Sequence, residues 1–324
     1  MFTADQSDGN TFLREPYSID YASISSYSSL LDPSSCECNG VVRMDYPFGY
    51  KKDNNIDILG SCNGLICMGI SRDRDSATKL YKDNSICIWN PSTREYKKIL
   101  IPRHDTGYYS ANPCRVRYGF GYDGTIDDYK LVRILGSSTW SCAQKIPYKF
   151  PHARRCRGLL FNGTLHWLGF TITQENSPEV IVSYDISNEK ALELPLPEET
   201  MLQLGNQNAH KNIGMLSDCL CLVLNFPPVH RYIWVMQEYG ADASWTKQYT
   251  FIHQMISNFV YSKPIWSLRN GEILIDVDYG FLLFDPSNGS QRMLEVQEFH
   301  DTYFLGQPVI YMESLVSLNT GTYV

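Results

Sequence analysis

The chain lacks several features that would assign it to a broad class at once. No apolar run approaches the 18 residues that a membrane-spanning helix needs, and the first 20 residues lack the charged-then-apolar order of a signal peptide. Basic residues are also scarce, since 28 Lys and Arg stand against 35 Asp and Glu. These absences indicate a cytoplasmic protein, which could also be nuclear, with no nucleic-acid partner and no membrane partner.

Patterns typical of catalytic and metal sites are missing as well. Cys36-x-Cys38 and Cys219-x-Cys221 are too closely spaced for zinc ligand pairs, and the seven histidines form no nucleophile signature. The ten cysteines, without a signal peptide, indicate free thiols in a reducing compartment. We therefore expect no metal, no cofactor and no enzymatic activity.

One glycine motif needs a decision between two interpretations. The stretch YGFGYDGTIDDYK (118–130) has the G-x-G-x-x-G spacing of a dinucleotide-binding loop. Such a loop opens a helix, whereas residues 126–135 carry the β-branched and aromatic residues of a strand. The stretch therefore predicts a β-hairpin with Asp123-Gly124 in its turn, where Gly would supply a positive φ.

Aromatic residues and a repeat are what the chain does have. Its 22 Tyr, 14 Phe and 6 Trp favour strands as the main element. A tight turn between two apolar runs recurs with a loose period of about 50 residues, and its second residue is Gly64, Gly124, Gly163, Asp218 or Gly271. After four of these turns, a further apolar strand ends in a polar turn, as in SICIWNPST, VIVSYDISN and GFLLFDPSN.

Each repeat predicts a four-stranded antiparallel sheet, and radially stacked sheets of this kind form a β-propeller. Five repeats fill residues 57–297, and strand-like runs in both tails predict a sixth blade that closes the ring. Only 39 residues separate Gly124 from Gly163, which indicates a truncated second blade. We predict an all-β, kelch-type, propeller-like domain over residues 12–318, with a disordered stub at 1–11 and a tail at 319–324.

Loops are the natural place for binding in such a fold. The longest polar-aromatic loop spans residues 103–113, and Tyr and Arg are enriched at binding hot spots. The candidate partner-binding residues are Arg103, His104, Tyr108 and Tyr109. The alternative is that this loop is an ordinary exposed linker.

A nearby group of acids raises a different function. Asp123, Asp127 and Asp128 suggest the paired carboxylates of a glycoside-acting enzyme or a carbohydrate-binding propeller. These acids flank one hairpin, however, whereas glycosidase carboxylates face each other across a cleft. A solvated turn is the favoured interpretation.

Several motifs of the chain occur together in one known family: WNPSTREYKKI, YGFGYDGTIDDYKLVRI, NGTLHWLG, YDISNEKALELPLP, IWVMQEYGADASWTKQYT and VIYMESLVSL. With these motifs, the chain resembles the F-box-associated domain of plant F-box proteins from about residue 12 to residue 318. That family includes S-locus F-box proteins and relatives acting in immune-receptor turnover.

The resemblance implies a non-catalytic function: recognition of a target protein by the substrate-receptor arm of an SCF-type ubiquitin ligase. In this family an N-terminal F-box docks on a Skp1-type adaptor, and only eleven residues precede the region of resemblance here. We therefore expect this chain to bind the adaptor only if an F-box is restored.

Overall fold

The computed structural model describes residues 1–7, 12–25, 35–38, 40–47, 54–74, 81–100, 116–135, 148–150, 157–171, 179–198, 209–226, 230–252, 261–278, 280–296 and 308–318. These residues form strands almost throughout, with the short helix α1 (Tyr21–Ser25) and the 3₁₀ turn Asp242–Ser244 as exceptions. The chain divides into two compact units. Unit 1 comprises Met1–Tyr17, Arg43–Glu193 and Val309–Val324, and unit 2 comprises Ser18–Val42 and Leu194–Pro308.

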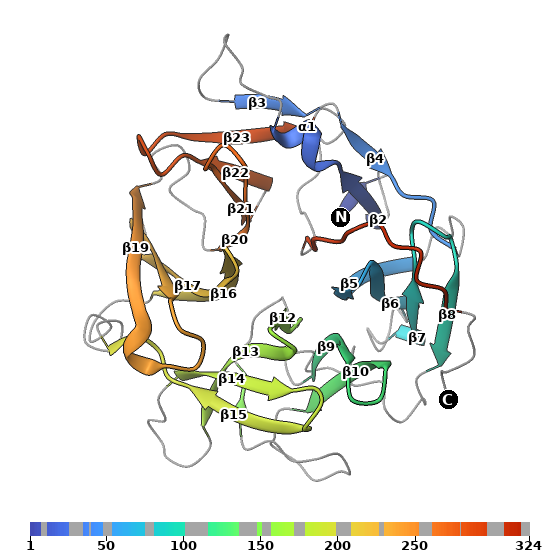
Figure 1. Cartoon of the computed structure of the whole chain (residues 1–324). Helices are drawn as coiled ribbons and strands as arrows, with labels where there is room; N and C mark the ends of the chain where they lie inside the picture. Colours follow the sequence, from blue (N-terminus) through green and yellow to red (C-terminus); the bar gives the residue numbers. More distant parts are fainter. Residues whose placement is uncertain are drawn as a thin grey trace. The chain divides into compact units, whose positions relative to one another are not determined.

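The first complete repeat forms a four-stranded antiparallel sheet in unit 1 (Figure 1). Its strands, in spatial order, are β5 (Asn54–Cys62), β6 (Leu65–Arg74), β7 (Tyr81–Trp89) and β8 (Tyr96–Leu100). Cys62 pairs with Leu65, so the turn between β5 and β6 consists of Asn63 and Gly64. Both turn residues have positive φ, 49° and 83°, as a two-residue hairpin turn requires.

The third repeat forms a second sheet of unit 1. Its strands are β11 (Tyr148–Lys149), β12 (Leu159–Phe161), β13 (Thr164–Thr171), β14 (Glu179–Asp185) and β15 (Lys190–Leu194). The order is β11-β13-β14-β15, and β12 pairs with β13 across the predicted Asn162-Gly163 turn.

The second repeat, for which the spacing predicts a truncated blade, is described only in part. Among the described residues it contributes a two-stranded sheet, β9 (Val116–Asp123) and β10 (Asp128–Leu135). The hairpin itself is confirmed, but its turn differs from the prediction. Asp123 pairs with Asp128, so four residues form the turn, and the positive φ of 56° belongs to Asp127 rather than to Gly124. The short polar side chain of Asp allows this conformation.

The glycines of the motif serve packing between sheets. A Cβ at Gly119 would lie 2.5 Å from Cδ1 of Leu165 on β13, and one at Gly121 would overlap the side chain of Ile186. Both positions must therefore stay small for β9 to approach the third-repeat sheet. A Cβ at Gly124 would meet no atom closer than 3.8 Å.

Unit 2 contains the fourth and fifth repeats. The fourth forms the sheet β16-β17-β18-β19, whose strands are His210–Leu216, Cys219–Phe226, His230–Met236 and Trp245–Ile252. The fifth forms β20-β21-β22-β23, whose strands are Ser262–Ser267, Ile273–Val277, Gly280–Phe284 and Gln291–Val296. One feature was not predicted: β3 (Ser35–Cys38) adds a fifth strand, parallel to β23.

The structure describes a strand within the segment 1–11 that was predicted to be a disordered stub, while residues 8–11 lie outside the described residues. β1 (Phe2–Ser7) pairs with β2 (Phe12–Ile19), and β2 pairs in turn with β4 (Val41–Arg43). Phe2 is buried and stacks on Tyr17 at a centroid distance of 5.9 Å. Burial of the Phe2 ring against Tyr17 stabilises the packing of β1 on β2.

Residues 308–318 also differ from the prediction, because this run is extended but is not a strand of a sheet. Its start meets the N-terminus, where the Val309 N–H donates to the Met1 carbonyl at 2.8 Å. The sheet that begins with β1 contains, among the described residues, only β1, β2 and β4, which all come from the N-terminal region. The repeated antiparallel sheets confirm the all-β, propeller-like fold class, while the count of six blades stays a prediction.

Candidate protein-interaction surface

The predicted partner-binding residues Arg103, His104, Tyr108 and Tyr109 lie outside the described residues. Two described segments of unit 1 offer surface next to the repeats that this loop connects. They are the turn at 124–127 and the C-terminal run at 309–318, which we call the strap.

A polar turn closes the third strand of three repeats in the same way. The side-chain Oδ1 atoms of Asn90, Asp185 and Asp285 each accept the backbone N–H two residues on, at 2.9 Å in every case. This confirms the predicted turn chemistry. The fifth residue of each turn has a positive φ, and these residues are Arg94, Glu189 and Gly289.

In the first of these turns, the side chain of Asn90 also makes hydrogen bonds outside the turn. Asn90 is buried, and its Nδ2 donates to the Ser314 carbonyl at 2.9 Å and to the Val316 carbonyl at 2.7 Å. A carboxylate has no N–H to donate, so Asp at this position would lack both bonds. Asn90 therefore joins the turn to the strap.

Further contacts along the strap fix its course. Glu95, in the same turn, accepts the Leu318 N–H at 2.8 Å and the Ser317 hydroxyl at 3.1 Å. At the other end, the Ser61 hydroxyl donates to the Ile310 carbonyl at 2.6 Å. Side chains of β5 and of the turn between β7 and β8 thus hold a segment that is not part of a β-ladder.

The strap has two apolar faces. Its inward side chains pack on hydrophobic clusters of unit 1, and they are Val309, Tyr311, Val316 and Leu318. The outward side chains are also large and apolar: Ile310 is 37% exposed, Met312 77% and Leu315 88%. Inward packing explains the first set, whereas the fold gives no reason for the second.

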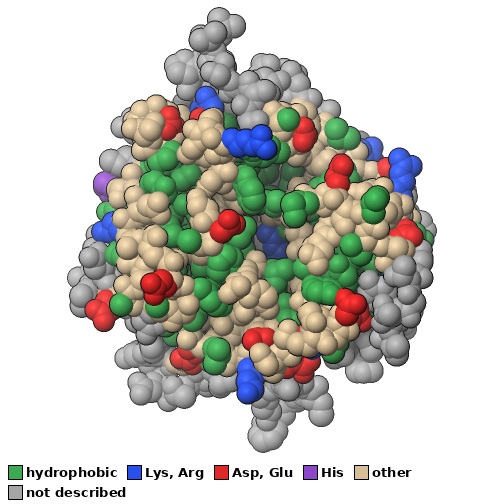
Figure 2. Space-filling view, viewed as in Figure 1, with side chains coloured by type: hydrophobic (Ala, Val, Ile, Leu, Met, Phe, Trp, Pro, Cys, Tyr) green, Lys and Arg blue, Asp and Glu red, His purple; other side chains and the backbone are tan. Residues whose placement is uncertain are grey.

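The strap and the β9–β10 hairpin share a core. Val316 and Leu318 belong to the same cluster as Phe120 on β9 and Tyr129 on β10. The hairpin turn adds one more outward aliphatic side chain, Ile126, which is 58% exposed. Residues 124–127 and 310–315 are thus exposed parts of two segments whose inner side chains share one core cluster. Figure 2 shows hydrophobic side chains reaching the surface over the β5–β10 part of unit 1, with single acidic side chains around them.

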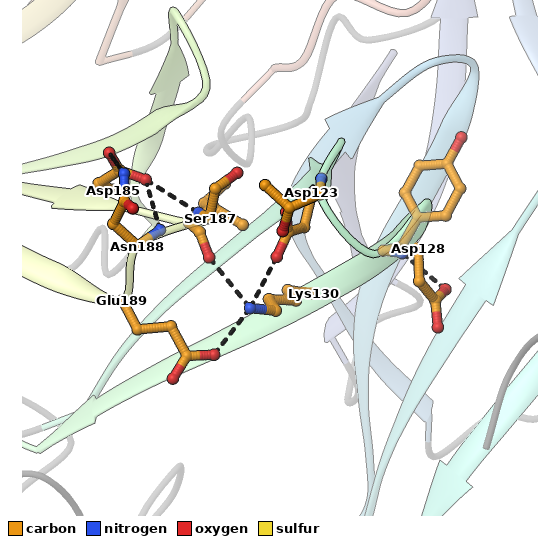
Figure 3. A network of polar contacts seen from close by, with 10 residues as sticks. Asp123, Asp128, Lys130, Asp185, Ser187, Asn188 and Glu189 are labelled. Atoms are coloured by element: carbon orange, nitrogen blue, oxygen red, sulfur yellow. Dashed lines mark hydrogen bonds and ion pairs between the residues drawn. The ribbon is translucent and has the colours of Figure 1, made fainter.

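An ion-pair network lies beside the hairpin turn (Figure 3). Nζ of Lys130 on β10 lies 2.8 Å from Asp123 Oδ2 and 2.7 Å from Glu189 Oε1, and it donates to the Ile186 carbonyl at 3.1 Å. The hydrogen bond from Lys130 holds the pKa of Asp123 well below its usual range, and the same bond raises the pKa of Lys130. This network connects the β9–β10 hairpin to the turn between β14 and β15.

The acids considered for carbohydrate chemistry are engaged locally. Asp123 is buried and paired with Lys130, Asp127 accepts the Tyr122 hydroxyl, and Asp128 Oδ1 accepts the Tyr129 N–H at 2.7 Å. They lie on one hairpin and stabilise its turn. Nothing in this arrangement favours a glycosidase pair, whose carboxylates flank a substrate cleft.

Exposed charges of both signs lie on and beside these segments. Asp127 and Glu313 are exposed, and so is Arg94 in the turn that binds the strap. Lys130 is paired with two carboxylates.

Two further groups fit structural roles. His166 is buried on β13, where its Nδ1 lies 3.2 Å from the Leu159 carbonyl, and burial lowers its pKa to about 4. Burial raises the pKa of the Cys87 thiol to about 12. Among the described residues, no group of three or more His, Cys, Asp or Glu could hold a metal ion, and no helix is long and apolar enough to span a membrane.

Sequence reasoning missed the strap as a surface. The apolar-rich run PVIYMESLVSL is typical of a strand, so the sequence did not indicate that large apolar side chains of this run stay exposed. The signal that could have revealed the strap is the Asn at position 90, where the corresponding turns have Asp185 and Asp285.

Comparisons with known proteins agree with this architecture. A family model described as "F-box associated beta propeller domain" matches residues 19–318. The F-box/kelch-repeat protein At3g23880 of Arabidopsis thaliana is 30% identical over 248 residues, which cover 72% of this chain and 62% of that protein.

Two further proteins of Arabidopsis thaliana are similar over longer parts of the chain. F-box protein CPR1 is 27% identical over 322 residues, covering 89% of this chain and 71% of that protein. F-box protein At3g07870 is 27% identical over 309 residues, covering 78% and 67% respectively. The chain thus spans less than two thirds of the length of At3g23880.

Proposed function

Because the chain belongs to the F-box associated beta propeller family, we propose that it is the target-recognition module of an SCF-type ubiquitin ligase. The observation that carries the proposal is the family match over residues 19–318, together with relatives that are named as F-box proteins. In such a receptor, an F-box binds the Skp1-type adaptor and the propeller presents the target protein.

The role is one of binding and not of catalysis. The motif residues that carry the family resemblance are used in building the fold: Gly119 and Gly121 pack β9, Asp123 pairs with Lys130, and Asn90 holds the strap. These residues stabilise the fold. We therefore infer that the exposed side chains between them bind the target protein. We place this activity in the cytoplasm, and in the nucleus where the target is nuclear.

The adaptor step is tested by a pull-down with purified Skp1. Two proteins are compared, the chain of 324 residues and the same chain extended by the F-box of a relative. We expect binding by the extended chain alone, because a stable interface buries roughly 1,200 Å² or more and the F-box supplies that surface. Equal binding by both proteins would contradict this division of roles.

The recognition step is tested in plant cells. The extended chain is expressed with a proximity-labelling tag and a proteasome inhibitor, and labelled proteins are examined for ubiquitin. We expect at least one protein whose ubiquitination requires the extended chain and decreases when the unextended chain is co-expressed as a competitor. If no protein shows this dependence, the proposed function is wrong.

A further inference from the structure

We propose that the backbone nitrogen of Met1 carries an acyl group in the functional protein, either an acetyl group or the carbonyl of a preceding residue. Such a group converts the amine into an amide, which has one N–H and no charge. The inference goes beyond target recognition, because it assigns a modification site at the residue before β1. It rests on the surroundings of that nitrogen in unit 1.

The Met1 nitrogen lies in an apolar environment with one hydrogen-bond acceptor. Met1 is 8% exposed and belongs to a hydrophobic cluster with Ile56, Ile58 and Val309. Its nitrogen donates to the Val309 carbonyl at 2.8 Å, and within the described ranges it makes no second hydrogen bond. An ammonium group has three N–H donors, whereas an amide has one. These surroundings therefore match an amide.

The same surroundings disfavour a positive charge. Burial lowers the pKa of the Met1 amine to about 5, and the Arg157 guanidinium acts in the same direction. Apolar side chains and a second cation do not stabilise an ammonium group. An acyl group removes this charge and with it the free-energy cost of burying it.

The direction of the chain leaves a route for the acyl group. Met1 and Val309 exchange both backbone hydrogen bonds, because the Val309 N–H also donates to the Met1 carbonyl at 2.8 Å. This reciprocal exchange is the pattern of an antiparallel pair, so atoms placed before Met1 run along the strap toward Ile310. Ile310 is 37% exposed and Met312 77%. The route therefore leads from the buried nitrogen toward solvent.

Each kind of acyl group has a defined origin. In acetylation, the neutral amine attacks the carbonyl carbon of an acetyl thioester, the N–C bond forms, and the thiol leaves with the proton. In the other case, the acyl group is the carbonyl of the peptide bond between Met1 and a preceding residue, as in the chain extended by an F-box. Both bonds form before folding, because folding buries the nitrogen.

Urea titrations compare three forms: the free amine, the amine acetylated during expression, and the chain with a short Gly-Ser segment before Met1. The amine has a pKa of about 8 when unfolded and about 5 when folded, so the folded state binds fewer protons between these values. The ratio of the unfolding constants, free form over acetylated form, should rise roughly tenfold per unit as pH falls from about 8 to about 5. It should stay level above about pH 8, and the Gly-Ser form should behave like the acetylated form. Parallel pH responses of the free and acetylated forms, or lower stability of the acetylated form above pH 8, would overturn the inference.

A substitution near the nitrogen tests the location. Arg157→Gln should reduce the total pH-dependent change in that ratio severalfold, because removal of this cation raises the folded pKa of the amine. The matched control is Arg94→Gln, since Arg94 is exposed in the same unit and does not act on the Met1 amine. Equal reductions in both variants would place the titrating group elsewhere and overturn the assignment to Met1.

Mass spectrometry of the N-terminal peptide distinguishes the two origins, with the chain expressed in plant cells. An acetylated Met1 assigns the acetyl group. A free Met1 amine, together with greater stability of the Gly-Ser form, assigns the peptide bond to a preceding residue. A free amine with no gain in stability from the Gly-Ser segment overturns both. None of these results decides whether a target is ubiquitinated, so the proposed function is tested separately.

Discussion

The capping residue Asn90 combines two roles, whereas Asp185 and Asp285 at the corresponding described turns have no N–H with which to fill the second. The Asn90 Oδ1 accepts the Ser92 N–H at 2.9 Å, whereas its Nδ2 donates to the carbonyls of Ser314 and Val316. Replacement by Asp keeps the acceptor and removes both donors. We therefore expect Asn90→Asp to keep the turn and to release the strap.

The free-energy cost of Asn90→Asp follows from the hydrogen bonds that the substitution removes. Loss of two hydrogen bonds costs about 1–3 kcal/mol, and a buried carboxylate facing two carbonyl oxygens brings the total to about 2–4 kcal/mol. If the strap opens locally, amide exchange in residues 309–318 should accelerate by roughly 30-fold or more. Hydrogen exchange resolved by peptide measures this directly, and chymotrypsin should cut the released strap after Tyr311 or Leu315.

The control reverses the substitution at the corresponding position of another repeat. Asp185 begins the turn between β14 and β15, and its Oδ1 accepts the Ser187 N–H at 2.9 Å. Asp185→Asn keeps this acceptor and should change exchange in its own turn by only a few fold. Unchanged exchange of the strap in Asn90→Asp, with the turn intact, would refute the reasoning about the two donors.

Three further predictions concern the buried parts of unit 1. Lys130→Met should lower the urea midpoint at pH 7 relative to the exposed control Lys190→Met. The ion pair between Lys130 and Asp123 stabilises the fold above the unfolded carboxyl pKa of about 4, and this contribution is lost as pH falls through the depressed folded pKa of Asp123. Lys130→Met should therefore also lose less stability than the wild type on acidification. His166 has a folded pKa of about 4, below its unfolded value of about 6.5, so the wild type should lose about 2–3 kcal/mol between pH 6.5 and pH 4.5. Urea titrations at both pH values should show that loss reduced in His166→Gln, and an unchanged loss would exclude His166 as its source. Gly119→Ala should cost about 1–3 kcal/mol, because its Cβ would meet Leu165. Gly124→Ala should be nearly neutral in the same urea titration, and equal effects would refute the packing role of the motif.

Local chemistry made much of this fold predictable from the sequence. Asn63-Gly64 and Asn162-Gly163 form two-residue hairpin turns, because these residue types tolerate positive φ. Asp185 and Asp285 cap their turns through bonds to backbone two residues on. Such features depend on a few neighbouring residues, so a single sequence is enough to place them.

The sequence also decided the main question raised by the glycine motif. Strand-type residues after Gly124 predicted a hairpin, and β10 pairs with β9 as expected. The position of the turn within 123–128 was less well determined, because both Gly and Asp accept a left-handed conformation. The structure assigns that conformation to Asp127.

The hydrophobic pattern of the sequence did not predict contacts between segments far apart in the chain. The parallel pairing of β3 with β23, the burial of Phe2 against Tyr17, and the bonds from Asn90 to the strap join residues far apart in the chain. Periodicity shows which faces of a segment are apolar, but it does not show which neighbour covers each face. Tertiary structure alone decided that Val316 faces the core while Met312 and Leu315 face outward, because the side chains of Asn90 and Glu95 fix the course of the strap.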